Sequence, residues 1–303
     1  MKHVFKSLLG ILVVYLLFHF SVVSIDAVIT FKRNLNFFTS IGLFSLLSIL
    51  VIGTYFRFYF CANLFGIIIR KRLLISASSE AYTLGQIIPG QLGIDGLRIL
   101  KLKELDRSKY KKSLLAATLV EKLVSLCTQL FIFCAFICII FKAEMGVLRL
   151  LSILLIVLMS CYLIFRLSKH IIEMKFGLIL QNVPRFFLIK IFLFGIAMNL
   201  VACTLIYNIS EVMLDLEGSS FLNTSVAMLS SNISAAIPIT PNGMGLSELV
   251  FSKILSTVSG ESRMDLYGTS YLIYRVFNMV GHLSIYLATV LEESIRASYS
   301  LGN

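Results

Sequence analysis

The feature that most constrains this chain is a series of apolar runs, several of which reach the ~20 residues that a helix needs to cross a bilayer. Only 14% of the 303 residues are charged and 58% are hydrophobic, a balance that soluble domains do not show. We expect about six membrane-spanning helices, at roughly 4–25, 38–60, 113–141, 147–165, 186–209 and 265–291. The sequence therefore predicts an all-α polytopic membrane protein, with residues 1–303 forming a single membrane domain.

The distribution of Lys and Arg predicts how the spans are oriented, since basic loops stay in the cytoplasm. Segment 97–112 has seven basic and two acidic residues, and segment 166–190 has five basic and one acidic. Segment 210–218 has three acids and no base, which fits the outside. We expect a plasma (inner) membrane protein with both termini in the cytoplasm, although Lys32 and Arg33 then fall in an outside loop. Topology accounts for the net charge of +11, so we expect no nucleic-acid binding.

Two of the remaining apolar segments are interrupted by proline and glycine. The first contains IIPGQLGIDGLR, residues 87–98, and basic residues flank it on both sides, so it must enter the membrane and return on the same side. Pro89 and Gly90 are expected to end one half-helix, Gly93 allows a tight turn, and the next half-helix starts near Ile94. The alternative is an ordinary Pro-Gly loop between short cytoplasmic helices.

The second interrupted segment repeats the first. Residues 230–253 align with 78–101 at an offset of 152 without gaps, and seven positions are identical. When a unit that crosses the membrane an odd number of times is duplicated, the second copy is inverted relative to the first. We therefore expect an inverted repeat of residues 1–145 and 146–303, each with a re-entrant broken-helix pair whose N-termini suit an anionic headgroup. The glycines and proline of the second break are Pro241, Gly243 and Gly245.

Ionisable residues at membrane depth cost ~2.5–3.5 kcal/mol or more, so each is a functional hypothesis. Glu121 shares a helix face with Ser125, Thr128 and Gln129, and Tyr271, Arg275, Asn278 and His282 form a similar stripe. We expect a polar cavity between the repeats that binds a charged headgroup through Glu80, Asp95, Arg98, Glu121, Lys122, Glu248, Arg275 and Asn278. The alternative is a set of structural ion pairs, for instance Glu121 with Arg275. His282 is expected to be a hydrogen-bonded core residue.

Four segments carry a resemblance to a known family: GQIIPGQLGIDGLRILKL, SLLAATLVEKLVSL, IPITPNGMGLSELVFSKIL and YLIYRVFNM. They resemble the flippase-like membrane family that is related to the transmembrane part of bacterial lysylphosphatidylglycerol synthase. The resemblance covers nearly the whole chain. It implies translocation of lipids or lipid-linked headgroups between leaflets, with polar roles for Asp95, Arg98, Glu121, Glu248 and Arg275. Lys122 departs from the family pattern, because arginine is commoner there and lysine cannot form a bidentate fork.

We therefore expect a flippase-like translocator of phospholipid or lipid-linked glycan headgroups, and not an enzyme. The sequence has no counterpart of the aminoacyl-transferase domain, no cofactor motif, and no zinc spacing among its six cysteines. Two alternatives remain open. The chain could be a non-catalytic membrane partner of a cytosolic lipid or glycan biosynthetic enzyme, docked through loop 98–112. Less favoured is a membrane-embedded glycosyltransferase, whose acids would be Glu211, Asp215 and Glu217.

Overall fold

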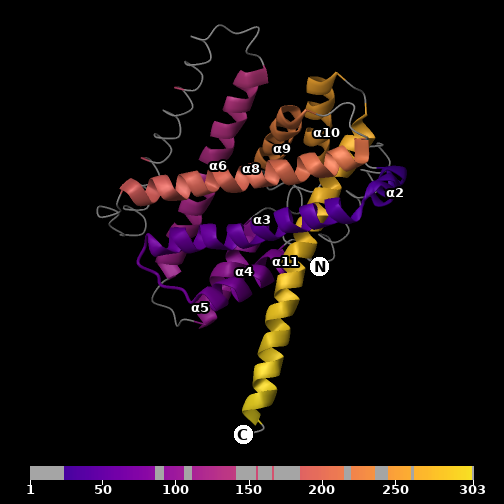
Figure 1. Ribbon diagram of the computed structural model, residues 1–303. Helices are drawn as coiled ribbons and strands as arrows, with labels where there is room; N and C mark the ends of the chain where they lie inside the picture. The colour runs from indigo at the N-terminus through magenta and orange to yellow at the C-terminus, as the bar shows by residue number, and fades with distance from the viewer. Residues whose placement is uncertain are drawn as a thin grey trace, which may run out of the picture.

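A computed structural model describes residues 24–85, 92–105, 111–140, 155, 166, 185–214, 220–235, 245–260 and 263–301. Its elements within these ranges are all helices (Figure 1), which confirms the all-helical prediction. The helices are α2 (Ile25–Asn34), α3 (Phe37–Asn63), α4 (Lys71–Gly85), α5 (Leu92–Leu105), α6 (Lys111–Ile140), α8 (Arg185–Leu214), α9 (Phe221–Ala235), α10 (Leu246–Ser259) and α11 (Met264–Leu301). The spans predicted at 4–25 and 147–165 lie almost wholly outside the described residues.

Three helices in the described part of the chain are long and apolar enough to cross a membrane. They are Phe37–Asn63 in α3, Lys112–Ile140 in α6 and Ile189–Met213 in α8. These match three of the predicted spans, because an apolar run of this length satisfies all its backbone groups only as a helix. The predicted span 265–291 is helical too, within the 38 residues of α11, but α11 is not among these three helices.

The segment before α3 differs from the sequence prediction. Lys32 and Arg33 were expected in a loop, but they form the last turn of α2. The Ser24 hydroxyl caps the start of this helix by accepting a hydrogen bond from the Ala27 N–H at 3.4 Å. Asp26 lies in the first turn of α2, and Lys32 and Arg33 lie in its last turn. Acidic residues at the start of a helix and basic residues at its end interact favourably with the helix dipole, so these charges stabilise α2.

Each of the two interrupted segments forms a pair of short helices packed against each other, α4 with α5 and α9 with α10. The breaks at 86–91 and 236–244, with Pro89, Gly90, Pro241 and Gly243, lie outside the described residues. In the first pair, α5 begins at Leu92, two residues before the predicted Ile94, and Gly93 lies in its first turn. In the second, Gly245 stands before α10 with a φ of 89°, a conformation that favours glycine.

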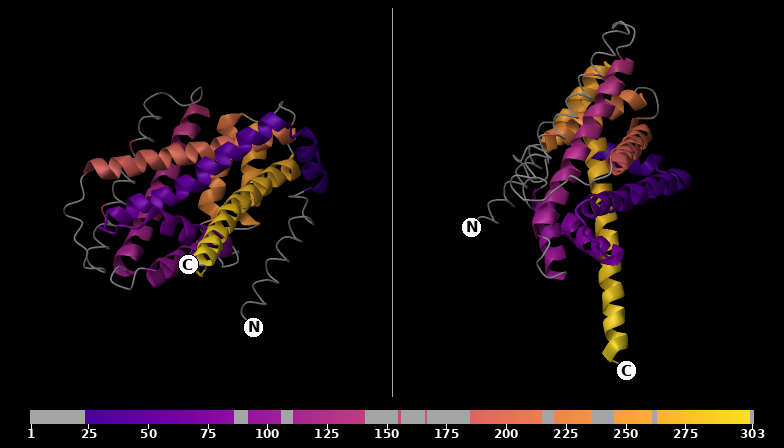
Figure 2. Two further views of the ribbon diagram at one scale, coloured as in Figure 1. Left: turned by 60° about the horizontal axis from the view of Figure 1, so that its bottom comes forward. Right: turned by 90° about the vertical axis from the view of Figure 1, so that its left-hand side faces the viewer.

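The helices of the two halves of the chain cross each other at the centre of the molecule. Helices α3 and α8 lie side by side, as Figure 1 shows. Helix α4 packs on α11 and α9 packs on α6, so each short pair contacts the long helix of the other half. Helix α11 continues well past the rest of the bundle towards the C-terminus (Figure 2). The centre of the molecule is therefore built from both halves.

Glycines allow the long helices to approach closely. A Cβ added at Gly195 would lie 2.9 Å from the Thr128 side chain, and one at Gly281 would lie 3.0 Å from Val51. Gly53 likewise meets the side chain of Met198 where α3 crosses α8. Small residues at such crossings let backbones pack tightly, which is the usual means of helix association in membranes.

Candidate functional site

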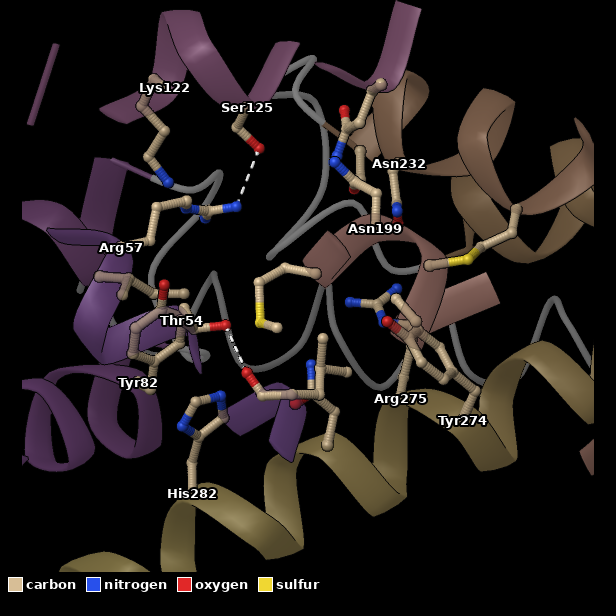
Figure 3. Close-up of a pocket in the computed structure, with 18 of the residues that line it drawn as sticks. Thr54, Arg57, Tyr82, Lys122, Ser125, Asn199, Asn232, Tyr274, Arg275 and His282 are labelled. Atoms are coloured by element: carbon tan, nitrogen blue, oxygen red, sulfur yellow. Dashed lines mark hydrogen bonds between the residues drawn. The ribbon is translucent and has the colours of Figure 1, made fainter. Parts of the chain in front are cut away.

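A cavity of about 190 Å³ lies between the two halves of the chain, lined by residues of α3, α4, α5, α6, α8, α9 and α11. Three of its lining residues are basic, namely Arg57, Lys122 and Arg275. Figure 3 shows Arg57 and Lys122 on one side of this cavity and Arg275 on the opposite side. Amides and hydroxyls make up most of the remaining polar lining: Thr54, Tyr82, Ser125, Gln129, Asn199, Asn232, Tyr271, Tyr274 and Asn278.

Behind one wall of the cavity, five charged residues form what we call the first-half network: Arg57, Asp95, Arg98, Glu121 and Lys122. Arg98 is its centre, with a side chain that is 0% exposed. Its Nη2 atom donates to Glu121 Oε2 at 2.6 Å and to Asp95 Oδ1 at 3.1 Å. The guanidinium also lies 3.8 Å from the centroid of the Phe58 ring, a cation–π contact.

The two other cations of the first-half network extend from these acids to the cavity. Arg57 Nε lies 3.4 Å from Glu121 Oε1, and its Nη1 lies 3.3 Å from Ser125 Oγ. Lys122 Nζ lies 3.2 Å from Asp95 Oδ2. The two contacts of Arg57 are long for charge-assisted hydrogen bonds. Two carboxylates are thus shared among three cations, of which Arg57 and Lys122 line the cavity and Arg98 is buried behind it.

A smaller group, which we call the second-half network, consists of Ser247, Glu248 and Arg275. Arg275 Nη1 donates to Glu248 Oε1 at 2.8 Å and to Ser247 Oγ at 3.0 Å. The other carboxylate oxygen of Glu248 accepts from the Gly245 N–H at 2.7 Å, so Glu248 caps α10 while it holds Arg275. One acid and one cation are paired here.

His282 forms part of the cavity wall together with two tyrosines. Its Nδ1 atom lies 2.7 Å from the hydroxyl of Tyr55. Its ring stacks on Tyr82, with centroids 4.2 Å apart and planes only 5° from parallel. These contacts fix the orientation of the imidazole, as expected for a hydrogen-bonded core residue.

The structure distributes the residues predicted for the site over three places. Lys122, Arg275 and Asn278 line the cavity. Asp95, Arg98, Glu121 and Glu248 belong to the two networks behind it. Glu80 pairs instead with Lys101, Nζ to Oε1 at 2.9 Å.

The ion pair suggested between Glu121 and Arg275 is replaced by pairs within each half. Glu121 binds Arg98 and Arg57, and Arg275 binds Glu248. Of the predicted break residues, Gly93 lies in the first turn of α5 and Gly245 is the residue that precedes α10.

Sequence reasoning missed Arg57, Asn199 and Asn232 as lining residues. Arg57 carried a usable signal, because it is a single charge inside the apolar span of α3 and such a charge needs a partner or a polar cavity. The asparagines gave a weaker signal, since an amide in a membrane helix often serves only helix packing. Among the described residues, no group of three or more His, Cys, Asp or Glu side chains is placed to hold a metal ion.

Comparison with known proteins agrees with the membrane character of the fold. A family model for the transmembrane region of lysylphosphatidylglycerol synthase matches residues 4–284. A search of curated proteins and a search of solved structures found no match. The match covers almost the whole chain, including every cavity-lining residue and both networks.

Proposed function

The chain belongs to the family of the lysylphosphatidylglycerol synthase transmembrane region, and we propose that it is a flippase-like translocator of lipid headgroups. Membership in this family relates the protein to membrane lipid metabolism. The finer proposal is that a phospholipid or lipid-linked glycan headgroup enters the central cavity and leaves on the other side of the bilayer.

The observation that carries this proposal is the charge of the cavity lining. Arg57, Lys122 and Arg275 line it, and the lining residues that the structure describes include no Asp or Glu. Cations gathered around a cavity in a membrane protein are stable only with a compensating negative charge, and part of that charge comes from the acids behind them. The phosphate of a lipid headgroup is the anion that the surrounding membrane supplies in the highest amount.

The arrangement of the helices supports movement of the headgroup. At the offsets of 152 and 153 that align the two halves, Lys122 with Asp95 corresponds to Arg275 with Ser247, and both pairs are within contact distance. The contacts of α4 with α11 and of α9 with α6 correspond in the same way. We propose that these features reflect an inverted repeat, in which rocking of one half against the other exposes the cavity to each leaflet in turn.

Leaflet exchange of fluorescent anionic phospholipid and polyprenyl-phosphate probes in proteoliposomes tests the proposal. We expect faster exchange than in empty vesicles, and a loss of most of this exchange in Arg57→Gln and in Lys122→Gln. The matched control is Lys253→Gln, since Lys253 is an exposed lysine of α10 and does not line the cavity. Equal exchange in all vesicles, with insertion confirmed, would overturn the proposal and favour a partner of a biosynthetic enzyme.

A further inference from the structure

The cavity is built to discriminate between headgroups of different charge. The acids behind its walls, Asp95, Glu121 and Glu248, all bind the cations of the two networks. A headgroup amine entering this cavity would therefore meet three cations and no free carboxylate among the described lining residues. Repulsion between like charges at a few ångströms in such a site is worth about tenfold in affinity or more.

The opposite wall of the cavity is rich in neutral hydrogen-bonding groups. Asn278 lines the cavity three residues after Arg275, on the same face of α11. Its Oδ1 atom is buried, and no described residue donates a hydrogen bond to it. Nearby, Asn232 Oδ1 accepts from the hydroxyl of Tyr271 at 3.0 Å. A buried amide oxygen without a donor is unfavourable, so a ligand hydroxyl in this position gains the full hydrogen bond.

We infer that the headgroup is a phosphate ester that carries a sugar or polyol and no basic group. This inference rests on the proposed function only in taking the cavity as the headgroup site. The phosphate lies between Arg57 and Lys122, and a hydroxyl of the sugar or polyol donates to Asn278. A lysyl ester of phosphatidylglycerol carries a net positive charge, so the cavity disfavours the lipid after which the family is named. A polyprenyl phosphosugar and a glycerol- or inositol-bearing phospholipid share the favoured chemistry.

Binding of defined lipids to the purified full chain tests the inference independently of transport. Native mass spectrometry over a lipid concentration series gives the dissociation constants. The probes are phosphatidylglycerol, its lysyl ester, phosphatidylmethanol and polyprenyl phosphoglucose. We expect phosphatidylglycerol to bind at least about tenfold more tightly than its lysyl ester. We also expect it to bind about three- to tenfold more tightly than phosphatidylmethanol, which lacks the hydroxyls. The ratio between phosphatidylglycerol and polyprenyl phosphoglucose shows which source of this chemistry fits better.

Two variants of Asn278 separate the charge effect from the hydrogen bond. Asn278→Ala should bind phosphatidylmethanol as the wild type does and lose the preference for phosphatidylglycerol over it. Asn278→Asp places an acid in the lining, so it should weaken the binding of phosphatidylglycerol. The difference in affinity between phosphatidylglycerol and its lysyl ester should then become smaller. Met279→Ala, at the neighbouring and exposed position, should keep both preferences. Arg57→Gln should weaken the binding of every anionic lipid by the same factor.

The outcomes distinguish this inference from the proposed function. Equal or tighter binding of the lysyl ester in the wild type, or an unchanged preference in Asn278→Ala, would overturn the inference even if leaflet exchange is observed. Selective binding without any leaflet exchange would support the inference and overturn translocation. If the wild type binds none of the four lipids, both the inference and the proposed function are overturned.

Discussion

The two networks are built on corresponding positions but carry different charge. In each, a basic residue of a long helix reaches the first turn of a short one, Lys122 to Asp95 and Arg275 to Ser247. The first-half network adds Arg57 and Arg98, whereas the positions 152 residues later hold Ile209 and Val250. Among the described residues, the first-half network therefore has three cations for two acids, and the second-half network has one of each. The surplus positive charge of the two networks therefore lies on one side of the cavity only.

Under the proposed function, this difference gives the two walls different tasks. The wall with surplus charge suits the phosphate of a headgroup, and the wall with balanced charge and amides suits the group attached to that phosphate. It also implies that the two networks differ in their importance for stability, because Arg98 is fully buried whereas the side chain of Arg275 is 13% exposed at the cavity.

The largest expected effect is on the stability of the first-half network. Glu121→Ala removes the shortest contact of a fully buried arginine, which should cost about 3–5 kcal/mol in the free energy of unfolding. Glu248→Ala leaves Arg275 next to the cavity, where water can solvate it, so the loss should be about 1–3 kcal/mol. Denaturant unfolding of both variants in the same detergent measures the two losses. A loss for Glu248→Ala as large as that for Glu121→Ala would contradict the difference drawn between the networks.

Close packing within the first pair of short helices gives the next effect. A Cβ at Gly85 would lie 2.7 Å from the Cα of Ile94, so Gly85→Ala forces α4 and α5 apart at a cost of about 1–3 kcal/mol. Gly96 in α5 has no atom within 4 Å of an added Cβ, so Gly96→Ala is the matched control. The control should be neutral or slightly stabilising, since alanine favours a helix by about 1 kcal/mol over glycine. The same unfolding measurement compares them, and equal losses would show that the observed approach is not tight.

A smaller effect on stability and a larger one on binding are expected for Arg57. Its hydrogen bonds are 3.3 and 3.4 Å long, so Arg57→Gln should change stability by only about 1 kcal/mol. The same change removes the surplus charge, and anionic lipids should then bind about tenfold more weakly. Native mass spectrometry measures the lipid binding, and denaturant unfolding measures the stability. Arg72→Gln, which breaks an exposed pair with Glu292, is the control and should alter neither. Undiminished lipid binding by Arg57→Gln would place the phosphate elsewhere.

The smallest expected effect concerns the contact between Tyr55 of α3 and His282 of α11, which joins the two halves of the chain at the cavity wall. Tyr55→Phe removes the hydrogen bond to His282 but keeps the ring, at a cost of about 1 kcal/mol in unfolding free energy. Tyr286→Phe, one turn beyond His282 on α11, is the control and should leave stability unchanged. Identical unfolding curves for the two variants would show that the bond to His282 contributes nothing.

Local rules account for the parts of the fold that were predicted correctly. The spans corresponding to α3, α6 and α8 follow from the length of their apolar runs. The division of the two broken segments into α4 with α5 and α9 with α10 follows from proline and glycine. Helix α2 was missed, because ten residues with alternating character give only a weak local signal next to a strong apolar run.

The sequence by itself determined the kind of protein: a helical membrane chain, its family, and the division of its two interrupted segments into pairs of short helices. Only the tertiary structure decided which of the polar residues share a partner and which face the cavity. Glu121 binds Arg98 and Arg57, which are 23 and 64 residues away, and Arg275 binds Glu248 rather than Glu121. Such partners depend on how whole helices cross, and the crossings are set by many weak contacts spread along each helix. Helix formation depends on neighbours within one turn, and so it can be predicted from the sequence.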